Sequence, residues 1–147
     1  MTEKEKMLAG EIYDCGDPEL LELWYLGKNL ARDYNLADAN NIEDKKKILK
    51  QLLGGFGENL WITAPFYVDY GCHIYLGDNC EINMNCTFVD NKTIRIGDRV
   101  LIASNVQMYT SSHPVLPQER LVPDWRERKT TFFRTYARPI EIENNVW

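Results

Sequence analysis

The 147-residue sequence has neither a long hydrophobic run nor a surplus of basic residues. A membrane-spanning helix needs about 18 consecutive apolar residues, and the charged N-terminus, Met1–Lys6, lacks the apolar core of a signal peptide. The net charge is −5 and the pI is about 5.1, whereas proteins that bind a phosphate backbone usually carry excess positive charge. We therefore expect a cytoplasmic protein that binds neither membranes nor nucleic acid.

Metal ligands are also scarce. The chain has two histidines and four cysteines, and the spacings of the cysteines match no CxxC metal site. Structural zinc is therefore not expected, and a reducing compartment disfavours disulfides. The phosphate-binding loop, the dinucleotide-binding glycine motif, the nucleophile elbow and the HExxH zinc motif are all missing. Nucleotide hydrolases, dinucleotide-dependent oxidoreductases, serine hydrolases and zinc proteases have no support.

Residues 1–56 have the patterns of helices. Thr2 and Glu5 have capping-box spacing, and Asp17-Pro18 and Asn40-Asn41 predict two further helix starts. Gly54-Gly55 is expected to end the last helix in a left-handed conformation. Apolar residues recur at helical intervals and predict buried faces formed by Leu20, Leu23, Trp24, Leu26, Leu30 and Tyr34, and by Ile42, Ile48, Leu49, Leu52 and Leu53.

From residue 57 onward the sequence repeats every six residues. This period fits neither a strand nor a helix, but it is typical of a parallel β-helix in which each hexad forms one face and one turn. The first position of each hexad should point into the core and the fifth should pack at a corner. Cys80 and Cys86 are fifth-position residues, so we interpret them as small buried hydrophobes. The first positions are Tyr70, Leu76, Ile82, Phe88, Ile96, Ile102, Met108 and Ile142, and the fifth are Ile74, Cys80, Cys86, Val100, Val106 and Val146.

His113 is the candidate for acid–base chemistry. It lies where the hexads give way to a loop, and an exposed imidazole titrates near neutrality. A purely structural histidine is the alternative. Asp90-Asn91-Lys92 interrupts the hexads, so this segment is expected to protrude. The nearby polar side chains either bind a polyol or simply form turns; they are Asp69, Asn83, Asn85, Asp90 and Asn91.

Motifs along nearly the whole chain are collinear with those of a known family. They are Met1–Gly10 with Tyr13-Asp14, Asp69–Gly71 leading into Ile74–Gly77, Asn83–Asp90, Ile94–Asp98, Tyr109–Pro114, Pro139–Ile142 and Asn144–Trp147. Taken together, they resemble the maltose and galactoside O-acetyltransferases.

The resemblance implies a fold and a mechanism. It implies a left-handed parallel β-helix over 57–147 with a helical N-terminal cap over 1–56, assembled as a homotrimer with active sites between subunits. It implies transfer of an acetyl group from acetyl-CoA to a sugar hydroxyl, without a metal. His113 would be the general base, and the acceptor-binding residues would be Asp14, Asp69, Asn83, Asp90 and Asn91.

Two departures from the family leave alternatives open. The stretch over about 113–139 is longer than in bacterial sugar enzymes, and its basic and aromatic residues would either contact CoA or form a plain surface loop. The family continues for several coils beyond Trp147, where most CoA contacts are expected, so the chain looks truncated. It could then be a non-catalytic member that binds sugar or assembles with full-length subunits. A purely structural module and an acetyltransferase acting on an amine are further alternatives.

Overall fold

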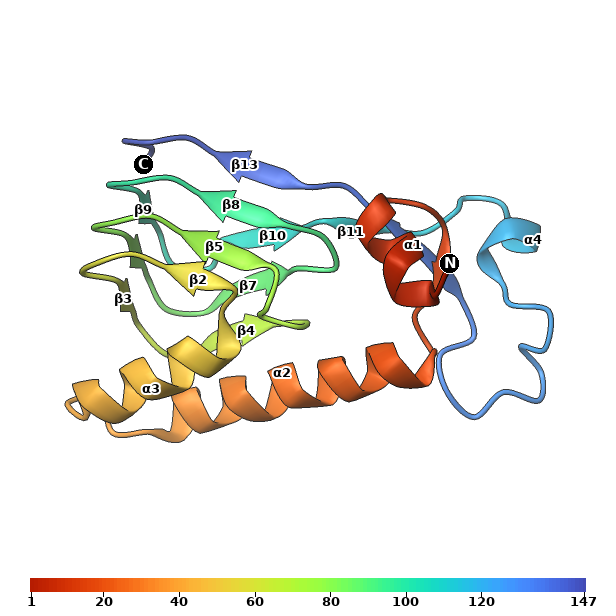
Figure 1. Cartoon of the computed structure of the whole chain (residues 1–147), viewed down its shortest axis with the longest axis horizontal. Coiled ribbons are helices and arrows are strands. Elements are labelled where there is room, and N and C mark those ends of the chain that lie inside the picture. Colours follow the sequence, from red (N-terminus) through yellow and green to blue (C-terminus); the bar gives the residue numbers. More distant parts are fainter.

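The computed structural model describes residues 1–147, in which an N-terminal helical part is followed by stacked short strands (Figure 1). Three of the helices begin at the predicted caps. Thr2 and Glu5 form the capping box, and the side chains of Asp17 and Asn41 accept backbone N–H groups of the first helical turns. The helices are α1 (Glu3–Ala9), α2 (Pro18–Leu36), α3 (Ile42–Leu52) and the short α4 (Pro117–Arg120).

The buried helix faces are narrower than the apolar pattern predicts. Leu26 and Ile42 are 55% and 58% exposed, so both were wrongly assigned to the core. Gly27 and Ala31 lie on the buried face of α2 instead. A Cβ at Gly27 would lie 2.8 Å from the carbonyl carbon of Tyr70, so α2 contacts backbone directly at this point. Close approach of the helix leaves room only for small side chains there, and larger apolar residues remain outside the contact.

The end of α3 also differs from the prediction. Its C-cap, Leu53, is extended, and Gly54 does not have a positive φ. The left-handed ending was therefore wrong. Space explains the glycine instead, because a Cβ at Gly54 would lie 2.7 Å from the ring of Tyr75.

The predicted left-handed parallel β-helix is confirmed. Three parallel sheets form its faces, in the strand orders β4-β7-β10, β2-β5-β8-β13 and β3-β6-β9. Their strands are β2 (Gly55–Phe56), β3 (Trp61–Ile62), β4 (Phe66–Val68), β5 (Ile74–Leu76), β6 (Glu81–Ile82), β7 (Cys86–Val89), β8 (Ile94–Ile96), β9 (Leu101–Ile102), β10 (Gln107–Tyr109) and β13 (Ile140–Ile142). A fourth, antiparallel sheet has the order β1-β12-β11 and contains β1 (Tyr13–Asp14), β11 (Ser111–Ser112) and β12 (Arg134–Ala137).

The hexad positions are buried as predicted in the inner coils. First-position residues such as Ile82 and Phe88 are fully buried, and the fifth-position Cys80 and Cys86 are buried as well. Bulky apolar side chains therefore fill the prism, and the thiols occupy corners. In the last coil, Val106 and Ile142 are only partly buried. They line an apolar hollow of about 400 Å³ with Val100, Leu101, Ile102, Ala103, Met108, Val146 and Trp147.

One corner of the β-helix is longer than the others. Equivalent residues in successive coils are 20 positions apart, which is two more than three hexads require. The two extra residues of each coil lie where the chain passes from the β4-β7-β10 sheet to the β2-β5-β8-β13 sheet. We call this the wide corner, and it comprises residues 69–73, 90–93 and 110–139. In its last crossing the spacing becomes 46, so this coil carries 26 additional residues.

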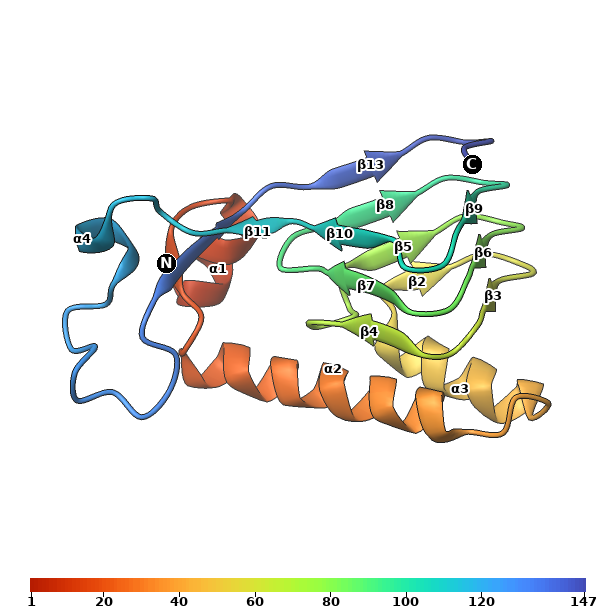
Figure 2. The same cartoon turned by 180° about the vertical axis from the view of Figure 1, so that it is seen from behind.

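The helical part and the additional residues meet at the wide corner. In Figure 2, α2 runs beneath the coils, and α1 lies beside the crossing strands β11 and β12. The stretch 113–139 is not a plain loop, because it contains α4 and β12. Strand β12 joins β1 of the N-terminal part to β11. The division at residue 56 stays a prediction, and β2 already pairs in parallel with β5. None of the helices is long and apolar enough to cross a membrane.

Candidate active site

His113 lies at the edge of the antiparallel sheet, one residue beyond β11. Ser112 pairs with Tyr136 on β12, so the imidazole comes level with Thr135. The His113 Nδ1 atom is 3.0 Å from the Arg134 carbonyl oxygen and 3.4 Å from Thr135 Oγ1. The ring also contacts the Phe133 ring edge-on, with 4.8 Å between the centroids. A histidine on a loop is thus held by three consecutive residues, Phe133 and the first two residues of β12.

These contacts determine which ring nitrogen of His113 carries the proton. A carbonyl oxygen only accepts hydrogen bonds, so Nδ1 must be the donor to Arg134. In the neutral imidazole, Nε2 then holds the free lone pair. The side chain is exposed, so that lone pair is available to a proton on a bound molecule. This is the arrangement that a general base needs.

Asp14 lies across the same sheet from His113. It pairs with Arg134 on β12, and neighbouring strands are about 4.8 Å apart. Its carboxylate accepts from the Gly16 N–H at 2.9 Å and from Arg128 Nη1 at 2.6 Å. His113, the predicted base, and Asp14, predicted to bind the sugar, are therefore two strand spacings apart, about 10 Å. The third strand, β12, lies between them and fixes both.

Asp69 is part of the wide corner and forms an ion pair with Lys28. Lys28 of α2 donates to Asp69 Oδ1 at 3.1 Å and to the Val68 carbonyl. The Asp69 side chain keeps about a quarter of its surface exposed. Its free oxygen can accept a further hydrogen bond from a ligand.

The prediction that Asp90-Asn91-Lys92 protrudes is wrong. Asp90 is 0% exposed, and its carboxylate accepts from the backbone N–H groups of Asp69, Tyr70 and His73 at 3.2, 2.8 and 3.2 Å. Burial raises the pKa of this carboxyl, and the hydrogen bonds oppose that effect. The segment that interrupts the hexads folds inward because backbone N–H groups in residues 69–73, the preceding crossing of the wide corner, need hydrogen-bond acceptors. A direct contact of Asp90 with the sugar that accepts the acetyl group stays a prediction.

Asn91 lies beside Asp90 and is 5% exposed. Its Nδ2 donates to the Tyr13 hydroxyl at 2.7 Å, while its Oδ1 has no hydrogen-bond partner. Burial raises the pKa of Tyr13, so this phenol stays protonated. An unpaired buried acceptor is costly. Because this oxygen is enclosed by the protein, direct contact of Asn91 with a sugar stays a prediction.

Asn83 is remote from the other predicted site residues within one chain. It follows β6 and precedes β7, whereas His113 lies beyond the opposite end of the neighbouring strand β10. The residues between these levels correspond to roughly 20–30 Å of extended chain. Its Oδ1 accepts the Met84 N–H at 2.8 Å. A single chain thus brings together Asp14, Asp69, Asp90, Asn91 and His113, but not Asn83.

Several residues that build this site have no signal in the hexad period. Thr135, Arg134 and Phe133 hold His113, and Arg128 and Lys28 pair with the two acids. The run from Phe133 to Ala137 contains strand-forming residues and could have predicted β12. The pairing of this strand with β1 could not be predicted, because β1 lies near the opposite end of the sequence.

A β-helix of hexapeptide repeats, with a histidine on the loop where the repeats are interrupted, is typical of the hexapeptide-repeat acyltransferases. Comparisons with known proteins make this more specific. Residues 6–57 match the family described as the maltose acetyltransferase hexapeptide capping motif. The galactoside O-acetyltransferase of Escherichia coli (strain K12) is 34% identical over 147 residues, which are 100% of this chain and 68% of that protein.

Solved structures agree with the sequence matches. A maltose O-acetyltransferase from Clostridium difficile 630 superposes with a TM-score of 0.90 at 37% identity, covering 100% of this chain and 73% of that one. A hexapeptide-repeat acetyltransferase from Vibrio cholerae O1 biovar eltor, complexed with acetyl coenzyme A, has a TM-score of 0.79 at 33% identity, covering 100% and 74%. The chain belongs to the maltose/galactoside O-acetyltransferase family, whose members are acyltransferases.

Proposed function

We propose that this protein transfers an acetyl group from acetyl-CoA to a hydroxyl group of a sugar, with His113 as the general base. The observation that carries the proposal is the hydrogen bond from His113 Nδ1 to the Arg134 carbonyl, which leaves Nε2 free to accept a proton. A homologue bound to acetyl coenzyme A supports the donor, and relatives that act on galactosides and maltose support a sugar acceptor.

The reaction follows from this arrangement. His113 Nε2 removes the acceptor hydroxyl proton as the oxygen attacks the thioester carbonyl carbon. The resulting tetrahedral oxyanion collapses, the carbon–sulfur bond breaks, and the departing thiolate takes the proton from the imidazolium. The products are an acetyl ester and free CoA. Direct transfer needs neither an acyl-enzyme nor a metal, and Cys80 and Cys86, buried in the core, take no part.

Acceptor binding is assigned to the polar groups at the wide corner. Asp14 and Asp69 each keep a carboxylate oxygen with capacity for a hydroxyl donor, and Asn91, which holds the Tyr13 hydroxyl, is the third predicted contact. Asp90 contributes by holding the backbone of residues 69–73 in place. A sugar presents several hydroxyl groups, and such a row of acceptors suits it.

The remaining predicted residue, Asn83, requires a second subunit. In a homotrimer, Asn83 of one subunit can approach His113 of a neighbour, which reconciles its distance within one chain with a role at the site. Mixing the inactive variants His113→Ala and Asn83→Ala should then restore activity at about a quarter of the sites. No restoration after subunit exchange would contradict a shared site.

The direct test is release of CoA by the folded 147-residue chain, given acetyl-CoA and a panel of sugars. We expect sugar-dependent release, and His113→Ala should lower turnover by about 10²–10⁴-fold. Thermal unfolding of the variant provides the folding control. If His113→Ala turned over at nearly the rate of the unchanged chain, His113 would not be the general base. Sugar binding without any CoA release would favour the non-catalytic alternative, and preferential acetylation of amines would favour the amine alternative.

A further inference from the structure

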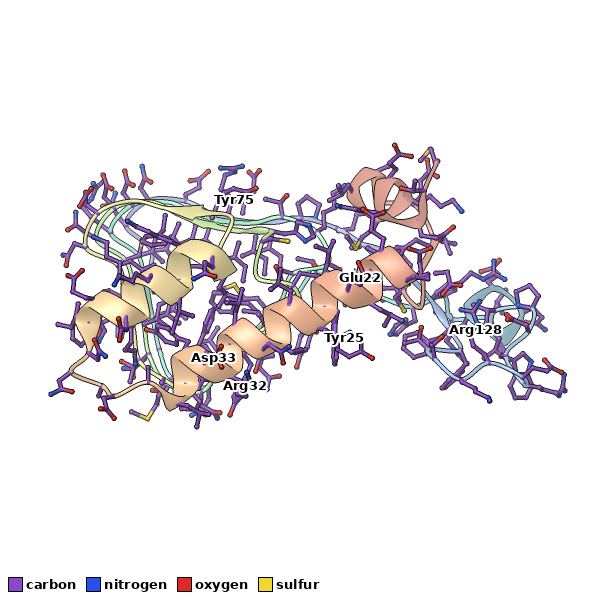
Figure 3. The ribbon with its side chains drawn as sticks, turned by 60° about the horizontal axis from the view of Figure 1, so that its bottom comes forward. Glu22, Tyr25, Arg32, Asp33, Tyr75 and Arg128 are labelled. Carbon is purple, nitrogen blue, oxygen red and sulfur yellow. The ribbon has the colours of Figure 1, made fainter.

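Arg128 is the side chain through which the additional residues of the last crossing reach the predicted acid Asp14. It lies in the segment between α4 and β12, beyond the N-terminal end of α2 (Figure 3). Its Nη1 atom is 2.6 Å from Asp14 Oδ2, and the two side chains are 20% and 24% exposed. The hydrogen bond to Asp14 raises the pKa of the guanidinium. The pair is thus a partly buried, charge-assisted contact that links positions 114 residues apart.

The donors of Arg128 are almost all used within the protein. Nη1 also reaches the Thr131 carbonyl at 3.4 Å, Nη2 lies 3.2 Å from Asp124 Oδ1, and Nε lies 3.4 Å from Asp124 Oδ2. The guanidinium is therefore fixed between two carboxylates. It serves mainly to orient Asp14 and to compensate its charge, and little of it remains to bind a ligand directly.

This compensation changes what Asp14 attracts. A bare carboxylate at the acceptor site would attract a protonated amine as strongly as it binds a neutral hydroxyl, or more strongly. With Arg128 in place, an ammonium group approaching Asp14 meets a cation at hydrogen-bond distance from the same carboxylate. A neutral hydroxyl meets no such repulsion and can still donate to a free lone pair. The other predicted acid, Asp69, is paired in the same way with Lys28.

We propose that Arg128 is a specificity-determining residue that selects neutral polyhydroxy acceptors over protonated amino sugars by neutralising Asp14. The inference deepens the proposed function and rests on it, since it takes Asp14 as a contact of the acceptor. It gives a purpose to the additional residues of the wide corner: they deliver the counter-charge that the carboxylate would otherwise lack.

The test compares binding of glucose, glucosamine and N-acetylglucosamine, which share one ring but differ in charge. Calorimetry on the 147-residue chain measures the dissociation constants and needs no turnover. In Arg128→Gln, we expect glucosamine to bind roughly fivefold tighter relative to the two neutral sugars. Arg128→Lys should keep the original ratio because it keeps the charge. Raising the salt concentration should shrink the difference.

Two further variants separate discrimination from folding. Asp124→Asn removes the exposed partner but leaves the Arg128–Asp14 pair, so the ratio should stay unchanged. Asp14→Asn removes the charge that Arg128 compensates, so adding Arg128→Gln to it should no longer favour glucosamine. An unchanged ratio in a folded Arg128→Gln chain that binds glucose would overturn the inference. Failure of every folded variant, including the unchanged chain, to bind any of the three sugars would overturn the proposed acceptor site itself.

Discussion

The inner coils and the wide corner are built by opposite means. Each inner coil pairs in parallel with residues 20 positions away, and its buried side chains repeat the same two hexad positions. At the wide corner, Tyr13 pairs in antiparallel with Thr135, and Asn91 contacts Tyr13 across 78 positions. Repetition therefore provides the rigid support, and single long-range contacts position the predicted site residues. The predicted catalytic and acceptor groups other than Asn83 gather at the wide corner.

The largest effect should come from the core of the coils. Ile82 is fully buried, so Ile82→Ala should lower the free energy of unfolding by about 2–5 kcal/mol. Its exposed neighbour provides the control, and Glu81→Ala should change stability by about 0.5 kcal/mol or less. Denaturant unfolding measures both. Equal losses would mean that the coils do not depend on the first hexad position.

A smaller loss is expected at the wide corner. Asp90→Ala removes the acceptor of the Tyr70 and His73 N–H groups and one of the two acceptors of the Asp69 N–H, and should cost about 1–3 kcal/mol. Hydrogen exchange should show the loss concentrated in residues 69–73. Asp98 makes a similar contact to the Asp78 N–H at an exposed corner, so Asp98→Ala is the matched control and should cost less. Uniform deprotection across all coils would argue against local support by Asp90.

The contact between the helical part and the wide corner can be tested at glycine. Alanine in a helix normally stabilises it, but at Gly27 a Cβ would meet the backbone of Tyr70. Gly27→Ala should therefore destabilise the protein by about 1–2 kcal/mol. A Cβ at Gly55 would lie at an ordinary 3.5 Å from Tyr75, so Gly55→Ala should be far milder. A more stable Gly27→Ala variant would show that α2 does not lie this close.

At neutral pH the smallest expected effect is that of Cys72 at the wide corner, because its influence on stability is confined to alkaline pH. Burial raises the pKa of this thiol from 9.0 to about 11. Between these values the unfolded chain loses the thiol proton before the folded chain does, so stability falls as the pH rises from about 9 to 11. Cys72→Ala should remove that part of the decline in denaturant titrations. The buried Cys86 has a raised pKa too, so Cys86→Ala shows whether the decline belongs to the wide corner alone.

The fold was largely predictable because its signals are local. Thr2, Asp17 and Asn41 mark helix starts within a few residues, and Ile82 or Phe88 show their burial through a fixed period. The predicted burial of Leu26 is wrong because the apolar stripe of α2 is wider than the face that contacts the coils. Periodicity predicts which side chains are suited to burial, but not how closely a partner approaches.

The site was predictable only in part, for a related reason. His113 was found because the repeat breaks beside it, but its partner, the Arg134 carbonyl, belongs to a backbone contact that no side-chain pattern encodes. Asp90 was placed outside because an Asp-Asn pair in an interruption usually marks an exposed turn. Its burial depends on the Tyr70 and His73 N–H groups of the preceding crossing, which have no backbone acceptor, and this becomes apparent only once the coils are stacked.

The 46-residue separation at the last crossing bears on the order in which the molecule assembles. Closing a 46-residue segment costs about 0.7 kcal/mol more chain entropy than closing one of 20. The earlier coils can add to one another by short closures, as in other repeat proteins, whereas β13 reaches β8 only after the chain has returned from β12. Because β11 and β12 lie within this segment, we expect the contacts of His113 to form together with the docking of β13 on β8, after the earlier coils have paired.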